Sequence, residues 1–109
     1  MDPIVFFGLE PTGERGRWTM PITRGLISGT GALFGGCGLG ACIEVAEQLS
    51  GRHLVWATAQ YLTYARPPSV LEVDAAEIVR GHQISQVRVL AHVGDQEILT
   101  VLALSLIHI

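Results

Sequence analysis

The second half of the chain alternates apolar and polar residues with a period of two. Successive side chains of a β-strand point to opposite faces of a sheet, so this alternation predicts half-buried strands over residues 71–76 and 85–93. Residues 54–64 are rich in β-branched and aromatic side chains, and residues 98–103 follow a Gly-Asp hairpin signal. With a turn at residues 80–82, the pattern predicts at least four antiparallel strands. The expected core side chains on these strands are Val55, Leu62, Leu71, Val73, Val87 and Val89.

Before these strands, the apolar positions follow a helical period. Their spacing of i, i+3, i+4, i+7 and i+10 is that of one face of an α-helix. The positions are Leu39, Cys42, Ile43, Ala46 and Leu49. The opposite side is polar, with Glu44, Glu47 and Gln48, and Gly51 follows as a natural stop. Because a lone helix this apolar requires a sheet to cover it, the pattern predicts an α+β domain with an antiparallel β-sheet around one α-helix.

The chain divides into three parts. Residues 1–25 form a lead-in with a polar, turn-rich loop at 10–17 and a short extended piece at 18–22. Residues 26–103 carry the helix and the strands and form the predicted domain. Residues 104–109, Leu-Ser-Leu-Ile-His-Ile, match the translation of a transposase adaptor used in shotgun sequencing. We therefore expect a truncated domain with an artefactual tail, the alternative being a natural hydrophobic strand end.

Composition narrows the function classes. The chain has 109 residues, of which 49% are hydrophobic and 16% charged, with a formal net charge of −3. This suits one compact domain, and the lack of a Lys/Arg cluster argues against a nucleic-acid surface. The sequence contains no run of about 18 apolar residues, so we expect no membrane span. Cys37 and Cys42 lie about 140° apart around the predicted helix, so we expect two buried, reduced thiols in a cytoplasmic protein.

Glycines crowd the start of the predicted helix, at positions 35, 36, 38 and 40. The first N–H groups of a helix lack intrahelical acceptors and carry partial positive charge, and glycine lets a ligand approach them. These glycines either form a ligand site or let the helix lie close against the sheet. A nucleotide site is disfavoured, because the spacing from Gly29 is G-x-G-x-x-x-G, one residue longer than the dinucleotide fingerprint.

Two stretches resemble the N-terminal half of the acyl-CoA thioesterase II type, a double-hotdog family. They are LFGGCGLGACIEVAE, residues 33–47, and YLTYARPPSVLEVDAAEIVRGHQISQVRVLAHVGDQEILTV, residues 61–101, within a likeness that covers roughly residues 26–103. The resemblance implies a hotdog fold, in which a curved antiparallel sheet wraps a central helix. It implies hydrolysis of a fatty acyl-CoA by activated water, without metal, cofactor or covalent intermediate. It also implies a second hotdog domain, in the same chain or in another copy, as partner.

The resemblance also implies catalytic roles. A backbone N–H of Gly35 or Gly36 would stabilise the oxyanion, and Glu44 is the candidate general base. Phe34 stands where single-hotdog relatives often carry a histidine, and Ile43 stands where some carry a catalytic acid, one position before Glu44. In double-hotdog relatives, the Asp, Thr or Ser, and Gln that orient the water sit mainly in the second hotdog, which we expect to be missing from this chain.

The candidate substrate contacts are Phe34, Gln60, Arg80, His82 and Gln83. Gln60 is polar in an apolar strand and would line the acyl channel, while the other polar residues would meet coenzyme A at a turn. Simpler interpretations stay open: a satisfied sheet glutamine, an exposed hairpin turn and, for the glutamates of the helix, a solvated acidic face. The histidines show no metal-binding spacing. The alternative function is a non-catalytic acyl-CoA-binding or structural half-domain.

Overall fold

The computed structural model of the chain describes residues 2–29, 31–33 and 35–106. In chain order its elements are α1 (Pro3–Phe7), β1 (Glu10–Pro11), β2 (Arg17–Pro21), η1 (Arg24–Leu26), α2 (Gly35–Ser50), β3 (His53–Tyr61), β4 (Val70–Arg80), β5 (Ile84–Val93) and β6 (Gln96–Leu106). The predicted order of a short strand, one apolar helix and four long strands is confirmed. The short helix α1 was not predicted, although Asp2 caps it by accepting a hydrogen bond from the Ile4 amide at 2.9 Å.

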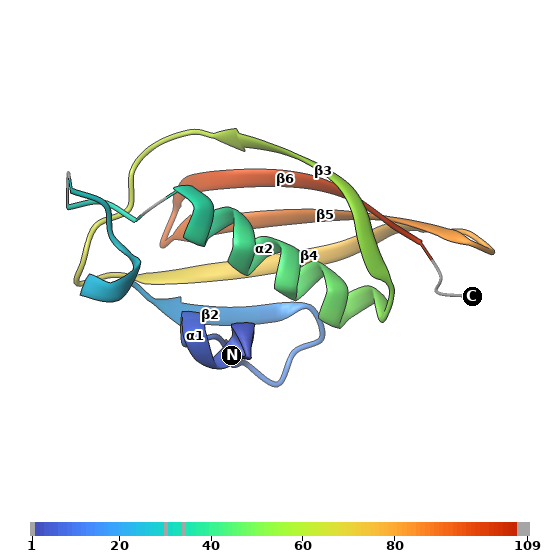
Figure 1. Cartoon of the computed structure of the whole chain (residues 1–109), viewed down its shortest axis with the longest axis horizontal. Coiled ribbons are helices and arrows are strands. Elements are labelled where there is room, and N and C mark those ends of the chain that lie inside the picture. The colour runs from blue at the N-terminus through green and yellow to red at the C-terminus, as the bar shows by residue number, and fades with distance from the viewer. Residues whose placement is uncertain (1, 30, 34, 107–109) are drawn as a thin grey trace.

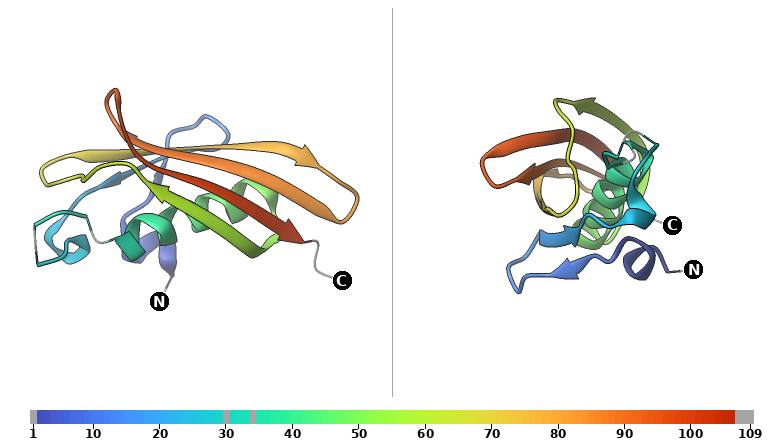
Figure 2. Two further views of the ribbon diagram at one scale, coloured as in Figure 1. Left: turned by 90° about the horizontal axis from the view of Figure 1, so that it is seen from above. Right: turned by 90° about the vertical axis from the view of Figure 1, so that its left-hand side faces the viewer.

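The strands of the described residues form one six-stranded sheet in the order β1-β2-β4-β5-β6-β3. Every neighbouring pair is antiparallel. The sheet curves around α2, which lies on its concave side (Figures 1 and 2). The β5–β6 hairpin turns at Gly94 and Asp95, as the Gly-Asp signal predicts, with Val93 paired to Gln96. This is the predicted α+β hotdog fold, an antiparallel sheet wrapped around one central helix.

Small side chains bring α2 close to the sheet. The buried residues of α2 are Gly38, Ala41, Cys42, Val45, Ala46 and Ser50. The predicted apolar stripe is confirmed at Cys42 and Ala46, which are 0% exposed. Leu39, Ile43 and Leu49 are only partly buried, so the centre of the buried face lies about one position from the predicted one. A Cβ built on Gly38 would lie 3.5 Å from Cδ2 of Leu99, so the helix meets the sheet through the positions with least side chain.

The inner face of the sheet supplies the rest of the core. Leu71, Val73, Val87 and Val89 are all at most 1% exposed, which confirms them as core residues. Val55 and Leu62 were also expected there, but they are 54% and 47% exposed. The register of β3 shifts between Leu54 and Trp56, which takes Val55 out of the alternation, and Leu62 follows the end of β3. A bulge and a strand end thus explain both errors.

The tail residues that the structure describes continue β6. Ser105 pairs with Ser85 of β5 and Leu106 pairs with Ile84, and Ser105 is fully buried. Residues 107–109 lie outside the described part of the chain. The adaptor origin of residues 104–109 stays a prediction.

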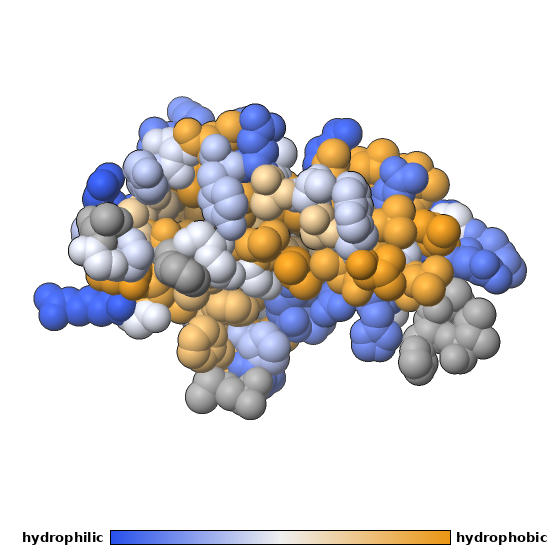
Figure 3. Space-filling model, turned by 45° about the horizontal axis from the view of Figure 1, so that its top comes forward, coloured by the Kyte–Doolittle hydropathy of each residue, from blue (hydrophilic) through white to orange (hydrophobic). Residues whose placement is uncertain are grey.

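No helix among the described residues has the length and apolar character needed to cross a bilayer. The sheet carries exposed apolar side chains, among them Trp56, which is 58% exposed, and Leu102, which is 47% exposed. Figure 3 shows apolar surface on the side of the molecule that carries β3 and β6.

Gly16 provides a test of how closely the chain before β2 lies against β4. Its φ is +81°, and a Cβ would lie 2.4 Å from the Ala75 carbonyl oxygen, whereas Gly13, with φ of +93°, has nothing within 4 Å. We expect Gly13→Ala to lower the free energy of unfolding by about 1–2 kcal/mol, the cost of a left-handed alanine. Gly16→Ala should lower it by about 1–3 kcal/mol more, because of the added overlap. Urea unfolding measures both, and equal losses would contradict the close contact.

Candidate functional site

A cavity of about 130 Å³ lies between the first turn of α2 and the sheet. Leu71 and Leu99, which are at most 1% exposed, form its apolar inner end. Its mouth lies near Tyr64, which is 70% exposed. The cavity is lined by Leu33, Gly35, Gly38, Tyr61, Thr63, Tyr64, Ala65, Leu71, Ile98 and Leu99. An apolar pocket with a few polar groups at its mouth is the usual form of a small-molecule site.

The start of α2 forms one wall of this cavity. Gly35 lines the cavity and is partly exposed, and Gly36 is exposed. An α-helix leaves its first N–H groups without intrahelical acceptors, and no other described residue accepts a hydrogen bond from the amides of Gly35 and Gly36. The dipole of this 16-residue helix adds partial positive charge at the same point. The arrangement therefore suits a ligand group that carries or develops negative charge.

Tyr61 holds the first turn of α2 against the end of β3. Its hydroxyl donates a hydrogen bond to the Gly35 carbonyl oxygen at 2.7 Å, and a Cβ on Gly35 would lie 3.4 Å from the Tyr61 ring. Burial, with a smaller effect of Cys42, raises the pKa of Tyr61, so the phenol is a neutral donor at ordinary pH. The sequence pattern assigned no role to Tyr61, because this contact joins residues 26 positions apart.

Two other predicted site residues lie away from the glycines. Glu44 accepts a hydrogen bond from Gln48 at 3.2 Å, and nine residues of helix place it about 13 Å along the axis from Gly35. Gln60 pairs with Thr100, in alternation with the buried Val101, so it faces away from α2 and does not line the cavity. Phe34 lies outside the described residues. The structure therefore does not bring Glu44 or Gln60 to the amides.

The remaining predicted contacts lie at the opposite end of α2. Arg80 donates to the Ser50 carbonyl oxygen at 3.1 Å and to Glu77 at 2.8 Å, while His82 and Gln83 are exposed in the β4–β5 turn. The 16 residues of α2 put this turn about 24 Å from the helix start. The position of Arg80 suits an interaction of its positive charge with the C-terminal end of the helix. Within one copy, the predicted contacts therefore fall into two groups.

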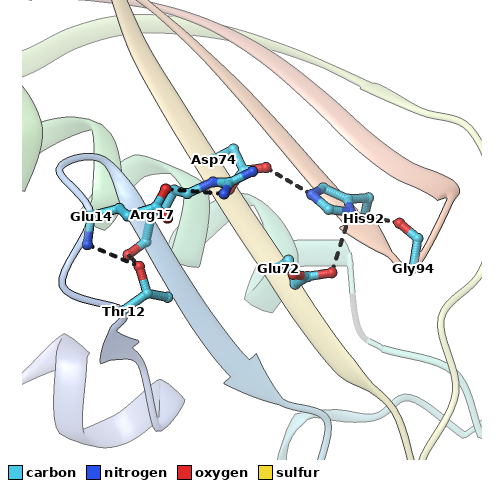
Figure 4. A network of polar contacts seen from close by, with 7 residues as sticks. All are labelled: Thr12, Glu14, Arg17, Glu72, Asp74, His92 and Gly94. Atoms are coloured by element: carbon cyan, nitrogen blue, oxygen red, sulfur yellow. Dashed lines mark hydrogen bonds and ion pairs between the residues drawn. The ribbon is translucent and has the colours of Figure 1, made fainter.

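A polar network lies on the outer face of the sheet, opposite α2 (Figure 4). Nε2 of His92 lies 2.8 Å from Oδ2 of Asp74, and Nδ1 lies 2.8 Å from the Gly94 carbonyl oxygen. Arg17 donates to the other oxygen of Asp74 at 3.0 Å, and Glu72 lies 3.6 Å from His92. The hydrogen bond to Asp74 is the main cause that raises the pKa of His92; burial opposes it. Only the protonated imidazole of His92 can donate hydrogen bonds to both Asp74 and the Gly94 carbonyl oxygen. Because Arg17 and His92 both bind Asp74, the network joins β2, β4 and β5.

Among the described residues, no three His, Cys, Asp or Glu side chains gather to hold a metal ion. Both cysteines are free thiols; Cys42 is buried as predicted, whereas the prediction was wrong for Cys37, which is partly exposed. None of the described residues that line the cavity is an Asp, Glu or His. The groups that these residues offer are backbone amides, hydroxyl groups and apolar side chains.

Comparison with known proteins supports the hotdog fold described above. A family model described as the acyl-CoA thioesterase N-terminal domain matches residues 24–106. No curated protein matches the chain.

Solved structures of similar fold include CoA-bound proteins. A hypothetical thioesterase from Streptococcus pneumoniae, solved with coenzyme A, has a TM-score of 0.90 at 13% identity over 96% of this chain and 90% of its own. A Streptococcus mutans protein bound to acetyl-CoA has 0.83 at 16% identity, over 92% and 86%. A candidate thioesterase from Novosphingobium aromaticivorans has 0.85 at 21% identity, over 92% of this chain but only 40% of its own. These likenesses show the fold.

The raised pKa of His92 predicts how stability depends on pH. In the unfolded chain the histidine has its ordinary pKa of about 6.5. Because the folded pKa is higher, the contribution of His92 is fully present below about pH 6.5 and is lost as the pH rises through the folded value. We expect the difference in unfolding free energy between the protein and His92→Gln to shrink between pH 6 and 9. Urea unfolding at several pH values measures it, and a difference that grows with pH would contradict the network.

The two cysteines should differ in reactivity. Burial raises the pKa of Cys42 to about 12, whereas Cys37 is partly exposed. At pH 8 the thiolate fraction of Cys42 is then about one in ten thousand. We expect a thiol reagent to label Cys37 quickly in the native protein and Cys42 only on unfolding. The fast phase of labelling should be absent in Cys37→Ser. Equal labelling rates in the native protein would show that Cys42 is not enclosed.

Proposed function

The chain belongs to the acyl-CoA thioesterase N-terminal domain family, and from this premise we propose that it takes part in hydrolysis of an acyl-CoA thioester to a free acid and coenzyme A. One observation carries the proposal. The cavity of about 130 Å³ reaches Gly35, where α2 and its first backbone amides begin. An apolar acyl group would therefore contact the apolar cavity wall, while the thioester carbonyl oxygen would lie at the backbone amides beside it.

The proposed reaction uses backbone donors for the charge that develops. The acyl group enters the cavity, and the thioester carbonyl oxygen lies at the amides of Gly35 and Gly36. Water attacks the carbonyl carbon, negative charge grows on the oxygen, and the C–S bond then breaks with release of the thiol of coenzyme A. Each well-placed amide would lower the barrier by about 3 kcal/mol. Tyr61 acts as a positioning residue, because it binds the Gly35 carbonyl oxygen at 2.7 Å.

Activation of the water requires a group from outside this cavity wall. No carboxylate or imidazole of the part of the chain that the structure describes lines the cavity, so we propose that a second hotdog domain, in the same chain or in another copy, supplies the base. In the sheet formed by the described residues, β3 is an edge strand, with a neighbouring strand on one side of its backbone only. Exposed edges of this kind are sites for strand pairing, and Trp56 adds apolar surface beside the edge. The chain covers 40% of the Novosphingobium protein, so that protein has length for a second domain.

A second copy would also explain the separation of the predicted contacts. Antiparallel pairing of β3 with its two-fold equivalent would set the two α2 helices antiparallel. The start of one helix would then lie on the same side of the assembly as the end of the other. In that arrangement Arg80, His82 and Gln83 could meet the coenzyme A of the partner's site, and Glu44 stays a candidate base only across this interface.

A second candidate function is acyl-CoA binding without turnover. The observation in its favour is that the described lining residues of the cavity include no carboxylate or imidazole. The two functions differ in one assay, because only the thioesterase releases free thiol from acyl-CoA. Binding of a nonhydrolysable thioether analogue together with no thiol release would favour the binding function.

Substitution of Gly36 tests the oxyanion role. Gly36→Pro removes the N–H in the first turn of α2, where proline is tolerated, and Gly36→Ala retains the N–H. In the full-length, assembled protein we expect Gly36→Pro to lower kcat by about 10²–10³-fold. Gly36→Ala should lower kcat much less, because Gly36 is exposed and retains its donor.

Circular dichroism and urea unfolding serve as controls that both variants fold. Thiol release is measured with a chromogenic reagent. If Gly36→Pro folds normally and turns over at the rate of the unsubstituted protein, the Gly36 amide is not a donor in the reaction.

A further inference from the structure

The inner end of the cavity is closed by core side chains. Leu71 of β4 is 0% exposed and Leu99 of β6 is 1% exposed, and both also belong to the main hydrophobic core. The opposite end opens between Tyr61 and Tyr64, where a shallow surface groove continues from the cavity. An acyl chain that enters at the mouth therefore meets the core after a limited distance.

The volume sets that limit. A protein cavity of about 150 Å³ lined by Leu, Ile and Phe accommodates one benzene ring, that is, six carbons. The cavity of about 130 Å³ should then hold on the order of five or six carbons. Longer chains would have to leave their remaining methylenes in the surface groove or displace Leu71 and Leu99.

We propose that this cavity makes the protein selective for short acyl groups, up to about six carbons, with Leu99 and Gly38 as the residues that set the length. The proposal rests on the function proposed above. Leu99 closes the inner end, and Gly38 lies opposite it on α2: a Cβ there would lie 3.4 Å from Cδ2 of Leu33 and 3.5 Å from Cδ2 of Leu99. Both distances are ordinary contacts, so a methyl group at position 38 fits but occupies cavity space.

The two positions predict opposite shifts. Gly38→Ala adds a methyl group to the wall and also favours the helix, so the variant should fold and its preferred chain should be about one carbon shorter. Leu99→Ala removes the end of a side chain at the inner wall, so the preferred chain should lengthen by about two or three carbons. Leu102→Ala is the matched control, because Leu102 lies on the same strand, is 47% exposed and does not line the cavity.

The experiment measures kcat/KM by thiol release with acetyl-, butyryl-, hexanoyl-, octanoyl-, dodecanoyl- and palmitoyl-CoA. For the unsubstituted protein we expect kcat/KM to rise by up to about fourfold per methylene, the transfer free energy of a buried CH₂, as far as about six carbons. Beyond that length it should level off or fall. Leu99→Val serves as a milder variant if Leu99→Ala does not fold.

The possible outcomes distinguish failure of the short-chain selectivity from failure of the proposed thioesterase function. A continued rise to palmitoyl-CoA, or variants that leave the length profile unchanged, would overturn the short-chain selectivity while leaving the thioesterase function in place. No thiol release with any of the six substrates would count against the thioesterase function instead. In that case calorimetric binding of the same acyl-CoA series tests the length limit directly, with the same expected break near six carbons.

Discussion

A single apolar helix in a small domain has to be covered by the sheet that surrounds it, and the close contact between α2 and that sheet governs the rest of this structure. A Cβ on Gly38 would lie in ordinary van der Waals contact with Leu33 and Leu99, at 3.4 and 3.5 Å. On another side of α2, a Cβ on Gly40 would lie 2.7 Å from Phe7 of α1. The glycine-rich helix start therefore contributes first to packing.

The same small residues also leave backbone exposed at one end of the helix. Gly36 is exposed, and Gly35 lines the cavity, as Gly38 does, and is held by Tyr61. Gly40 therefore serves close packing, whereas Gly35 and Gly36 leave backbone open to a ligand. The polar network around His92 lies on the other face of the sheet, so it stabilises the strands without entering the proposed site.

The fold was predictable from the sequence because the apolar residues follow two clear spacings, alternation in the strands and the helical repeat in α2. Strand alternation identified the inner residues of β4 and β5, and the helical period identified α2. Helix α1 was missed because five residues are too few for a period, although the Asp2 cap was visible in the sequence. Val55 was misplaced because a bulge is a local event that alternation does not predict. The buried face of α2 was shifted because glycine and alanine count for little in an apolar pattern.

The candidate site was predictable only in part, for a physical reason. The helix start can be located from the sequence, and with it the amides of Gly35 and Gly36. Tyr61 joins that start from a strand 26 residues away, and only the register of the sheet decides whether such a residue points toward the helix or, like Gln60, away from it. The resemblance to the thioesterase family placed Glu44 and Arg80 in one site with the glycines, whereas the length of α2 keeps them apart within one copy.

The central claim is that uncovered amides at the start of α2 meet the thioester carbonyl. Titration of a nonhydrolysable butyryl-CoA analogue, followed by two-dimensional NMR of the backbone amides, tests it most directly. The account predicts that the amide protons of Gly35 and Gly36 shift downfield on binding, with smaller changes at residues lining the cavity. Saturable binding that leaves both amides unshifted, with changes confined to the β4–β5 turn or the outer face of the sheet, would contradict it.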